Sequence, residues 1–472
     1  MKKMSIFRHP VLQKVLVTST LLALYVPYSD AAPHYELEAC CSLCPEANDD
    51  ASYNTEFLKV SQQLVEGTDG WLYRSKLDLD EQFEIDQNTL NEMSRFQAAL
   101  ASRGTELLMV YQPTRGLINP GGIIDNQTKP YDFITASTSY NQALKQIRST
   151  GIIVPNFETL IDDGDTPEFY FRRDAHWAPH GAMLTAQVVA DTVKELDVYP
   201  SIPEQKFTTS RTGLLGFTGT HQKAAYLICG TQYPTQYVDK FDTSPTEEAE
   251  GDLFGDDSLP EVVAAGTSFT NGRSNYNFVG YLKEFLSRDI LNIGQAGGGV
   301  IGSLLQYLPT EDYQESPPKL LIWEVPSYTS LSNSFNYRQL IPLVNNGCAD
   351  KPKILSHTME LKPGTNEVLF NGGGEVKNIL SGDYLLDIQF SNPDIKRLQA
   401  KVWYHNSRKE SITLKHRDRV DSQGRFVFEL RSEGEWKDFI FTSFDIEIDD
   451  SYPSDLKVTA SMCQRSDSEL PY

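Results

Sequence analysis

The pattern of apolar residues changes near residue 349, and this change most constrains what the chain can fold into. Before it, short continuous apolar runs alternate with stretches of helical periodicity. Continuous runs are typical of strands covered on both faces, and strands that alternate with helices predict a parallel sheet flanked by helices. The strand candidates are residues 106–111, 151–154, 261–266 and 319–323, and the helical stretches include 181–196 and 276–286.

After residue 349, short strand-like runs follow one another, separated by turn formers and with no helical periods between them. This arrangement predicts an all-β sandwich. A chain of 472 residues is also too long for one hydrophobic core. We therefore predict an α/β domain over residues 44–347 and a β-sandwich over 348–472. The sandwich strand candidates are residues 384–388, 400–404, 425–430, 439–448 and 456–460.

The first 31 residues are typical of an export signal. A basic start precedes an apolar run over residues 15–26, and Ser29 and Ala31 stand at the −3 and −1 positions of a small-residue cleavage site. The run is too short and too interrupted to span a bilayer comfortably, so an uncleaved anchor is the alternative. No later segment is long and apolar enough for a membrane span, and we expect a soluble, exported protein.

Six cysteines lie beyond this signal, and an even set in an exported chain favours disulfides. Cys40, Cys41 and Cys44 also permit a metal site, but zinc needs a second Cys or His pair at similar spacing. Neither Cys229 nor Cys348 has one nearby. We therefore predict disulfides. Residues 37–40 have a faint likeness to a lipidation signal, although they lie well beyond the apolar run.

The charge of the chain is strongly negative: 42 basic against 64 acidic residues give −22. Such a balance argues against a nucleic-acid partner, because neutralising phosphates requires a surplus of Lys and Arg. Residues 396–425 reverse it locally, with nine basic and three acidic residues, or +6. Cations beside aromatic rings can hold a polymer of acidic sugars, and a solvated face is the alternative. The polymer-binding candidates are Lys396, Arg397, Lys401, Trp403 and Arg408.

Asp174-Ala175-His176 is the most informative motif, and it stands just before a helix that we expect to start at Pro179. In a loop, this spacing lets the carboxylate take the Nδ1 proton and leaves Nε2 of the imidazole available as a base. His176 and His180 could also form a metal pair. A zinc protease motif needs Glu beside the first His, however, and Trp177 occupies that place. We predict a catalytic base and no metal, and a structural histidine is the alternative.

A serine at the end of a predicted strand can serve as the nucleophile for this base. The strand candidate 261–266 leads directly into Gly266-Thr267-Ser268, and a helix is expected from about Tyr276. Gly-x-Ser at a strand end is where α/β folds expose a serine hydroxyl, often next to backbone N–H groups that can hold an oxyanion. Asp174 and His176 precede Ser268 in the sequence, and this order is compatible with a catalytic triad because triads are defined by their geometry and not by sequence order.

These motifs resemble the SGNH hydrolase superfamily in permuted order, since typical members carry the serine block first. Residues 297–299 add a Gly-Gly-Gly loop. The resemblance is closer to the AlgX/AlgJ family of alginate O-acetyltransferases and covers nearly the whole chain beyond the signal. It rests on the strings VYQPTRGL at 110–117, HWAPHGA at 176–182, GDLFGD at 251–256 and IWE at 322–324.

The resemblance implies an SGNH hydrolase-like parallel sheet followed by a carbohydrate-binding sandwich. It implies a periplasmic enzyme that transfers acetyl groups onto mannuronate residues of alginate, without a cofactor, with Ser268 as nucleophile, His176 as general base and Asp174 as its orienting carboxylate. The Ser268 N–H and the 297–299 loop would hold the oxyanion. It further implies a substrate pocket lined by Tyr276, Gly298, Trp323 and Tyr328, and disulfides joining Cys44 to Cys229 and Cys348 to Cys463, which leaves Cys40 and Cys41 unassigned.

The expected partners are polymannuronate and other alginate acetylation and secretion proteins of the cell envelope, and the chain is expected to be monomeric. No acyl-carrier motif is visible, so a partner protein or a small exported carrier would supply the acetyl group. Two other functions remain open. One is a carbohydrate acetylesterase that uses the same triad, and the other is a non-catalytic scaffold that binds polymer within a secretion complex.

Overall fold

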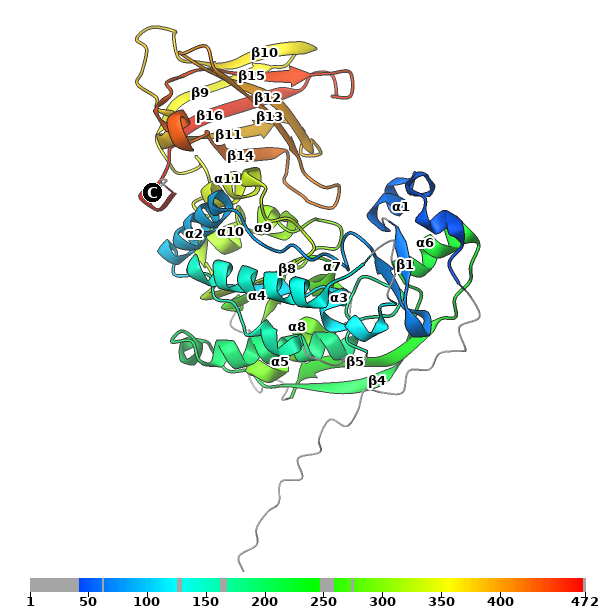
Figure 1. Cartoon of the computed structure of the whole chain (residues 1–472). Coiled ribbons are helices and arrows are strands. Elements are labelled where there is room, and N and C mark those ends of the chain that lie inside the picture. Colours follow the sequence, from blue (N-terminus) through cyan, green and yellow to red (C-terminus); the bar gives the residue numbers. More distant parts are fainter. Residues whose placement is uncertain are drawn as a thin grey trace, which may run out of the picture.

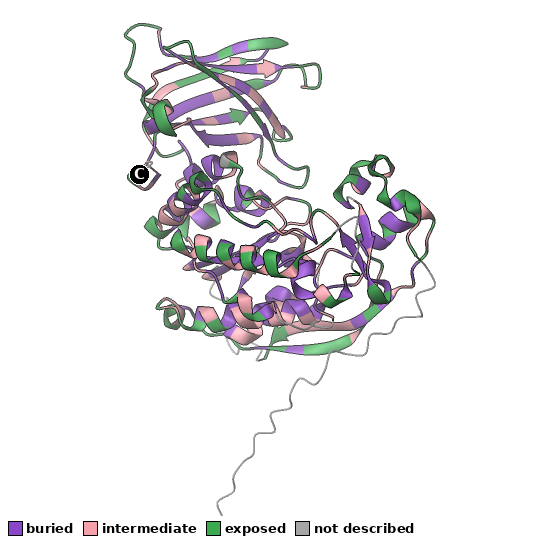
Figure 2. Cartoon of the chain, viewed as in Figure 1, coloured by how far each residue is buried: buried purple, intermediate pink, exposed green. Residues whose placement is uncertain are grey.

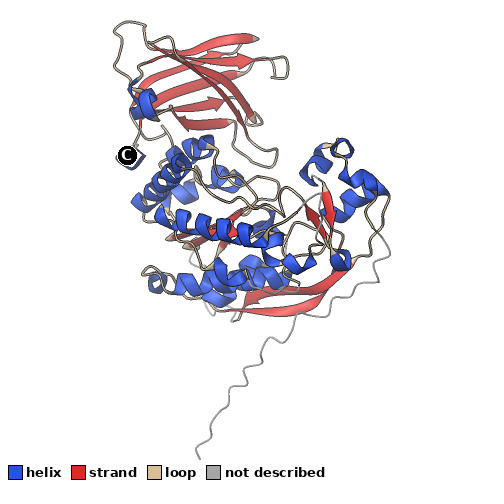
Figure 3. Cartoon of the chain, in the orientation of Figure 1, coloured by secondary structure: helices blue, strands red, loops and turns tan. Residues whose placement is uncertain are grey.

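The computed structural model describes residues 42–469 except 62, 125–129, 162–167, 247–258 and 273–275 (Figure 1). The predicted export signal, Cys40 and Cys41 therefore lie outside the described residues. Within the described part, no helix is long and apolar enough to cross a membrane. Figure 3 shows that the main helices are concentrated in the first domain, whereas the second domain is built mainly of strands.

A four-stranded parallel sheet with the order β3-β8-β6-β7 forms the centre of the first domain. The three longer strands are almost entirely buried, which explains their continuous apolar sequences. The sequence prediction of a strand at 151–154 is wrong: Ile153 makes only an isolated parallel bridge to Leu108, and Pro155 has no N–H to extend the ladder. The strands are β3 (Glu106–Gln112), β6 (Val262–Ala265), β7 (Leu291–Asn292) and β8 (Leu320–Pro326).

Helices surround this sheet, and the predicted helix start at Pro179 is confirmed. The carboxylates of Asp86 and Asp132 cap the first turns of α2 and α4. The long helices are α2 (Gln87–Ser102), α4 (Phe133–Ser149), α5 (Pro179–Lys194), α6 (Thr220–Cys229), α8 (Phe278–Leu286) and α11 (Ser334–Leu343). The short ones are α1 (Glu56–Ser61), α3 (Arg115–Ile118), α7 (Ser268–Asn271), α9 (Gly302–Tyr307) and α10 (Glu311–Glu315).

The first domain also contains two antiparallel pairs of strands that are absent from the sequence prediction. The short one pairs β1 (Leu64–Glu66) with β2 (Leu72–Arg74), and the long one pairs β4 (Phe207–Phe217) with β5 (Gln236–Pro245). Both disulfides implied by the family resemblance are present. Cys44–Cys229 ties the start of the described chain to α6, and Cys348–Cys463 ties the segment between α11 and β9 to β16.

The second domain is a sandwich of two four-stranded antiparallel sheets, with the orders β10-β15-β12-β13 and β14-β11-β16-β9. Alternate side chains of β12 and β13 are buried between the sheets, where they join a continuous apolar core (Figure 2). The strands are β9 (Lys353–Glu360), β10 (Gly364–Phe370), β11 (Tyr384–Phe390), β12 (Arg397–Tyr404), β13 (Lys409–Lys415), β14 (Arg425–Glu429), β15 (Phe441–Ile448) and β16 (Lys457–Gln464).

Buried ion pairs fix the sandwich to the α11 end of the first domain (Figure 1). The guanidinium of Arg338 on α11 contacts the Glu410 carboxylate at 2.6 Å and also donates to the backbone carbonyl of Glu429. Arg95 on α2 pairs with the Glu429 carboxylate at 2.7 Å. Removing one partner of a buried pair leaves an uncompensated charge, so these contacts fix the orientation of the two domains.

Candidate active site

Ser268 lies at the carboxyl end of β6, where the chain turns into the single-turn helix α7. Gly266 makes this turn possible: a Cβ added there would lie 2.4 Å from Thr270 Oγ1 and 2.6 Å from Glu324 Oε2. Thr267 caps α7, with its hydroxyl accepting from the Phe269 N–H. The half-buried Ser268 hydroxyl is therefore held at the mouth of the sheet.

His176 connects Ser268 to Asp174. The Ser268 Oγ lies 2.7 Å from His176 Nε2, and His176 Nδ1 lies 2.5 Å from Asp174 Oδ1. The backbone N–H of His176 also donates to that oxygen at 2.9 Å. The structure thus brings together all three residues that the sequence analysis selected, within hydrogen-bond reach and in the order serine, imidazole, carboxylate. This is the arrangement of a serine nucleophile with a general base and an orienting acid.

Asp174 is buried, and the start of α6 holds its second oxygen. Oδ2 accepts from the Thr220 N–H at 2.6 Å and from the Thr220 hydroxyl at 2.9 Å. Gly219 allows this approach, because an added Cβ would lie 2.0 Å from the Arg173 carbonyl oxygen. Burial raises the pKa of Asp174, but His176, His221 and the Thr220 N–H together bring that pKa below its ordinary value. Asp174 is therefore ionised at neutral pH.

A second buried carboxylate stands behind Thr220. His221 Nδ1 lies 3.3 Å from the Thr220 hydroxyl, and His221 Nε2 lies 3.3 Å from Asp78 Oδ2. Asp78 is paired at 2.6 Å with Arg74, whose guanidinium lies over the ring of Tyr328. A polar network thus continues from Asp174 through Thr220, His221, Asp78 and Arg74 to Tyr328.

Glu324 on β8 is fully buried directly beneath the nucleophile loop. It accepts from the Thr267 N–H at 2.8 Å, the Thr267 hydroxyl at 2.9 Å and the Thr270 hydroxyl at 3.1 Å. Burial raises the pKa of Glu324, and these donors partly offset that effect. The Glu324 carboxyl group therefore fixes Thr267 and Thr270, the residues on either side of Ser268 and Phe269.

Two of the four residues expected to line the pocket have other roles. Tyr276 is buried and stacks on the His176 ring, with centroids 5.2 Å apart. Trp323 is 1% exposed because β8 is a central strand, and its Nε1 donates to the Val300 carbonyl at 2.9 Å. Neither residue belongs to the lining of the cleft described below: Tyr276 supports the imidazole, and Trp323 supports the loop after Gly299. Gly298 and Tyr328 do line this cleft.

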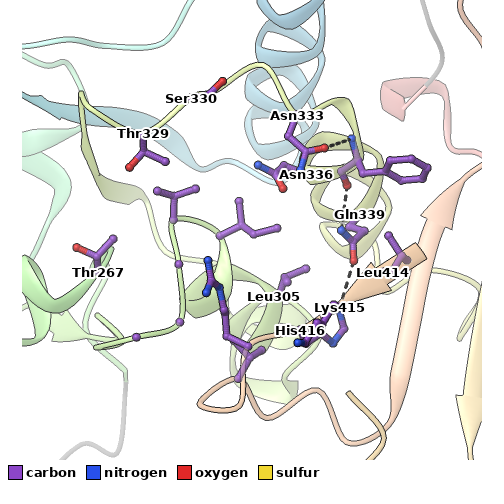
Figure 4. A pocket seen from close by; sticks show the side chains of 18 of the residues that line it. Thr267, Leu305, Thr329, Ser330, Asn333, Asn336, Gln339, Leu414, Lys415 and His416 are labelled. Atoms are coloured by element: carbon purple, nitrogen blue, oxygen red, sulfur yellow. Dashed lines mark hydrogen bonds between the residues drawn. The ribbon is translucent and has the colours of Figure 1, made fainter. Parts of the chain in front are cut away.

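A cleft of about 860 Å³ opens beside Ser268 and runs between the two domains. Figure 4 shows Thr267 on one side, with Leu414, Lys415 and His416 of the sandwich on the opposite side and Asn333, Asn336 and Gln339 at the α11 wall. Its lining comprises residues 267–268, 297–301, 328–330, 413–417 and Val60, Leu305, Pro326, Asn333, Phe335, Asn336, Gln339 and Val420. Such a volume is typical of a ligand site, and none of these residues is an Asp or a Glu.

Backbone N–H groups near Ser268 can hold an oxyanion. The Gly298 N–H is already used in a turn, since it donates to the Gln295 carbonyl at 3.2 Å. Among the described residues, the N–H groups of Ser268, Gly297 and Gly299 have no acceptor. The positive φ angles of Gly297 and Gly299, 78° and 76°, are accessible to glycine without strain. The loop therefore presents N–H groups at the cleft through a conformation that its glycines permit.

The polymer-binding candidates lie around the outer face of the sandwich, and each of their cations is already engaged. On β12, Lys401 pairs with Glu447 at 2.7 Å and Arg397 with Asp449 at 3.5 Å. The remaining contacts join Trp403 Nε1 to Asp445 at 2.7 Å, Arg408 to Glu435 at 3.4 Å and the Lys396 amine to the Val420 carbonyl. The surplus of positive charge expected from the sequence is therefore reduced on this face, and the Trp403 ring remains its distinctive feature.

Three residues of the site were missed by the sequence analysis: Thr220, Glu324 and Arg417. Thr220 and Glu324 act on residues 46 and 57 positions away. Glu324 stands in the IWE string at 322–324, but that string gave it no role in the site. Arg417 was counted within the basic segment, but no sequence signal placed it in the cleft with Ser268. Among the described residues, no group of three or more His, Cys, Asp or Glu side chains is arranged to hold a metal ion.

Comparison with known proteins agrees with this two-domain architecture. Residues 64–327 match the family model for the SGNH hydrolase-like domain of the acetyltransferase AlgX, and residues 347–471 match that of a C-terminal carbohydrate-binding module. The solved structure of AlgX from Pseudomonas aeruginosa superimposes with a TM-score of 0.81 at 38% identity. It covers 90% of this chain and 100% of that chain.

Curated relatives extend the match along the sequence. The alginate biosynthesis protein AlgX of Pseudomonas syringae pv. tomato is 39% identical over 466 residues, which are 97% of each protein. The probable alginate O-acetylase AlgJ of the same organism is 30% identical over 276 residues, or 56% of this chain and 68% of AlgJ. By domain content, overall fold and full-length similarity, the chain belongs to the AlgX family.

Proposed function

We propose that the chain is a periplasmic O-acetyltransferase that transfers acetyl groups onto mannuronate residues of alginate through an acetyl-serine intermediate. The observation that carries this proposal is the 2.7 Å contact between Ser268 Oγ and His176 Nε2, with Asp174 hydrogen-bonded to the other imidazole nitrogen. The acetyltransferase names of the family model and of the AlgJ relative supply the reaction class.

The reaction proceeds in two acyl transfers. His176 Nε2 takes the Ser268 proton as Oγ attacks the acetyl carbonyl of an ester or thioester donor. The tetrahedral intermediate expels the leaving group, which receives that proton from the imidazolium, and acetyl-serine remains. A sugar hydroxyl then loses its proton to His176 and attacks the acetyl carbonyl, and Ser268 regains a proton as the acetylated sugar leaves.

Negative charge develops on the carbonyl oxygen in both steps. The N–H groups of Ser268, Gly297 and Gly299 have no acceptor among the described residues, which makes them the candidates for the oxyanion site. Removing one oxyanion donor typically costs about two to three orders of magnitude in rate. Charge stabilisation at this loop is therefore expected to be a large part of the catalysis.

Three observations support alginate as the acceptor. The curated relatives carry alginate in their names, and a carbohydrate-binding module forms the second domain. The cleft beside Ser268 has no acidic side chain in its lining, although the chain as a whole carries a charge of −22. A polyanion is therefore repelled by most of the surface and admitted at the cleft. We propose that other envelope proteins of alginate acetylation deliver the acetyl group.

Trapping the intermediate is the most direct test. Incubation with p-nitrophenyl acetate, followed by rapid quenching and mass spectrometry, should add one acetyl group to the peptide that contains Ser268. Ser268→Ala should abolish both the adduct and ester turnover while it leaves oligomannuronate binding intact, and Ser201→Ala on an exposed turn is the matched control. Unchanged turnover in Ser268→Ala would exclude Ser268 as the nucleophile.

Adding oligomannuronate separates transfer from hydrolysis. A transferase should form O-acetylated oligomer, detected by mass spectrometry, in competition with release of acetate. Release of acetate with no acetylated oligomer would identify an acetylesterase, and polymer binding without any ester turnover would identify a scaffold.

A further inference from the structure

Two cations of the carbohydrate-binding module face into the cleft that also contains Ser268. Lys415 ends β13, and Arg417 follows in the loop toward β14. The other ionisable groups of the lining are neutral at pH 7, since burial lowers the pKa of His416 to about 4 and raises that of Tyr328 to about 12. Lys415 and Arg417 therefore give the cleft a net positive charge that nothing in its lining offsets.

These two side chains differ from the cations that the sequence analysis selected as polymer-binding candidates. Within the described residues, neither the Lys415 amine nor the Arg417 guanidinium takes part in a hydrogen bond or an ion pair, and both side chains are exposed. Lys401, Arg397 and Arg408, by contrast, each contact a carboxylate. Lys415 and Arg417 thus line the cleft without a direct contact to a carboxylate of the described chain, and Glu56 acts on Lys415 only through an electrostatic interaction.

Arg417 lies against the glycine loop beside the nucleophile. A Cβ built on Gly299 would be 3.9 Å from Arg417 Nε, and one built on Gly297 would be 3.5 Å from Arg419 Cγ. The Arg417 side chain is therefore next to the glycine loop that lines the same cleft as Ser268. The absence of side chains on this loop is what lets the module approach so closely.

We propose that Arg417, assisted by Lys415, binds the carboxylate of the acceptor sugar acid beside Ser268, so that the module selects the acceptor within the active site. This inference rests on the proposed acetyltransferase function. A guanidinium can bind a carboxylate through two parallel hydrogen bonds, which fixes the orientation of the sugar as well as its charge. A hydroxyl on the same sugar ring is then presented to the acetyl-serine in a defined position.

The sandwich also offers a path for the rest of the polymer. In the register of β12 and β13, Lys415 lies opposite Arg397, and Thr413 lies opposite Gln399. These side chains therefore share one face of the sheet. Thr413 and Lys415 line the cleft, whereas Arg397 and Gln399 belong to the neighbouring strand β12. The cleft is therefore continuous with the face that carries Trp403.

The experiment compares two acceptors, oligomannuronate and its carboxyl-reduced, neutral form, in acetyl transfer from p-nitrophenyl acetate. The parent should prefer the charged acceptor. In Arg417→Gln, transfer to oligomannuronate should fall about tenfold or more relative to ester hydrolysis, because a charged hydrogen-bonded contact is lost, and the preference should disappear. Arg417→Lys should restore part of the rate. Arg211→Gln removes a cation on β4 that pairs with Asp239, and it should change neither rate.

The outcomes distinguish this inference from the function on which it rests. A parent enzyme that acetylates neither acceptor would overturn the proposed transferase function and this inference with it. A parent that acetylates oligomannuronate, together with an Arg417→Gln variant of the same rate and the same preference, would overturn the carboxylate-binding role alone.

Discussion

Replacing Thr220 with valine removes one hydrogen bond from Asp174 and keeps the size of the side chain. Asp174 Oδ2 has two donors, the Thr220 N–H at 2.6 Å and the Thr220 hydroxyl at 2.9 Å, and the carboxylate is fully buried. Hydrogen bonds to charged groups contribute about 1.5–3 kcal/mol, and no solvent can replace this one. The backbone donor remains, so the lower end of that range is the appropriate estimate.

A loss of this size corresponds to about a tenfold decrease in kcat/KM for p-nitrophenyl acetate, since about 1.4 kcal/mol equals a factor of ten in rate. The pH dependence should change as well. A carboxylate with one donor fewer attracts the imidazolium proton more strongly, so the acid-side midpoint of the pH–rate profile should move to higher pH. A purely structural role of Thr220 would leave this midpoint unchanged.

Two further variants make the result decisive. Thr220→Ser keeps the hydroxyl and should retain the parent rate and pH profile, whereas Thr192→Val removes a helix hydroxyl on α5 and should have no effect on either. Melting temperatures of all three variants show whether each is folded. A folded Thr220→Val variant with the parent rate and midpoint would refute the argument that this hydroxyl positions Asp174.

Three other predictions follow from the packing, the outer face and the buried histidines. Gly266→Ala should lower both the melting temperature and ester turnover, because the added Cβ would meet Thr270 and Glu324. Gly373→Ala is the control: the space around Gly373 is open, so thermal denaturation and activity should not change. Trp403→Ala should weaken oligomannuronate binding in calorimetry by more than about threefold, because stacking of a sugar on the indole ring is lost on a face where Arg397, Lys401 and Arg408 are already paired with carboxylates. An unchanged affinity would exclude that face. Burial lowers the pKa of His221 and His416 to about 4, whereas the unfolded chain has the ordinary value of 6.5. Below pH 6.5 the unfolded state therefore binds protons that the folded state does not, and the free energy of unfolding should fall by roughly 2 kcal/mol for each histidine at pH 5. Urea unfolding at pH 7 and pH 5 measures this loss of stability. In His416→Gln the loss should be about half that of the parent, and an equal loss in both proteins would contradict the argument.

The elements that the sequence predicted are those whose local pattern matches their environment. The strands β3, β6 and β8 are buried on both faces, so their apolar runs are continuous and visible. The strand β4 was missed because it is largely exposed and rich in Thr, Ser and Gly, and its pairing with β5 is a contact between distant segments. Residues 151–154 have the composition of a strand, but Pro155 limits their pairing.

The same distinction applies to the site. Asp174, His176 and Ser268 could be predicted because each belongs to a short motif at an element boundary, where loops expose side chains. The roles of Thr220 and Glu324 could not be predicted, because a tertiary hydrogen bond to a distant residue leaves no local pattern, even where the residue stands in a family string, as Glu324 does. Trp323 shows why a pocket role is hard to predict, since an aromatic residue near the site can support a loop from below as well as line a pocket.

The rigidity of the domain interface determines what the carbohydrate-binding module contributes. A module on a flexible tether would raise the local concentration of polymer without selecting which sugar unit meets the acetyl-serine. Here Glu410, on the same strand as Lys415, is held by Arg338 in a buried ion pair, and both side chains are less than a tenth exposed. Breaking such a pair is costly, so the strand that carries the cleft cations keeps its position relative to Ser268. The module therefore forms a fixed wall of the cleft beside Ser268, and under the proposed function that wall would hold one sugar carboxylate at a constant distance from the acetyl-serine.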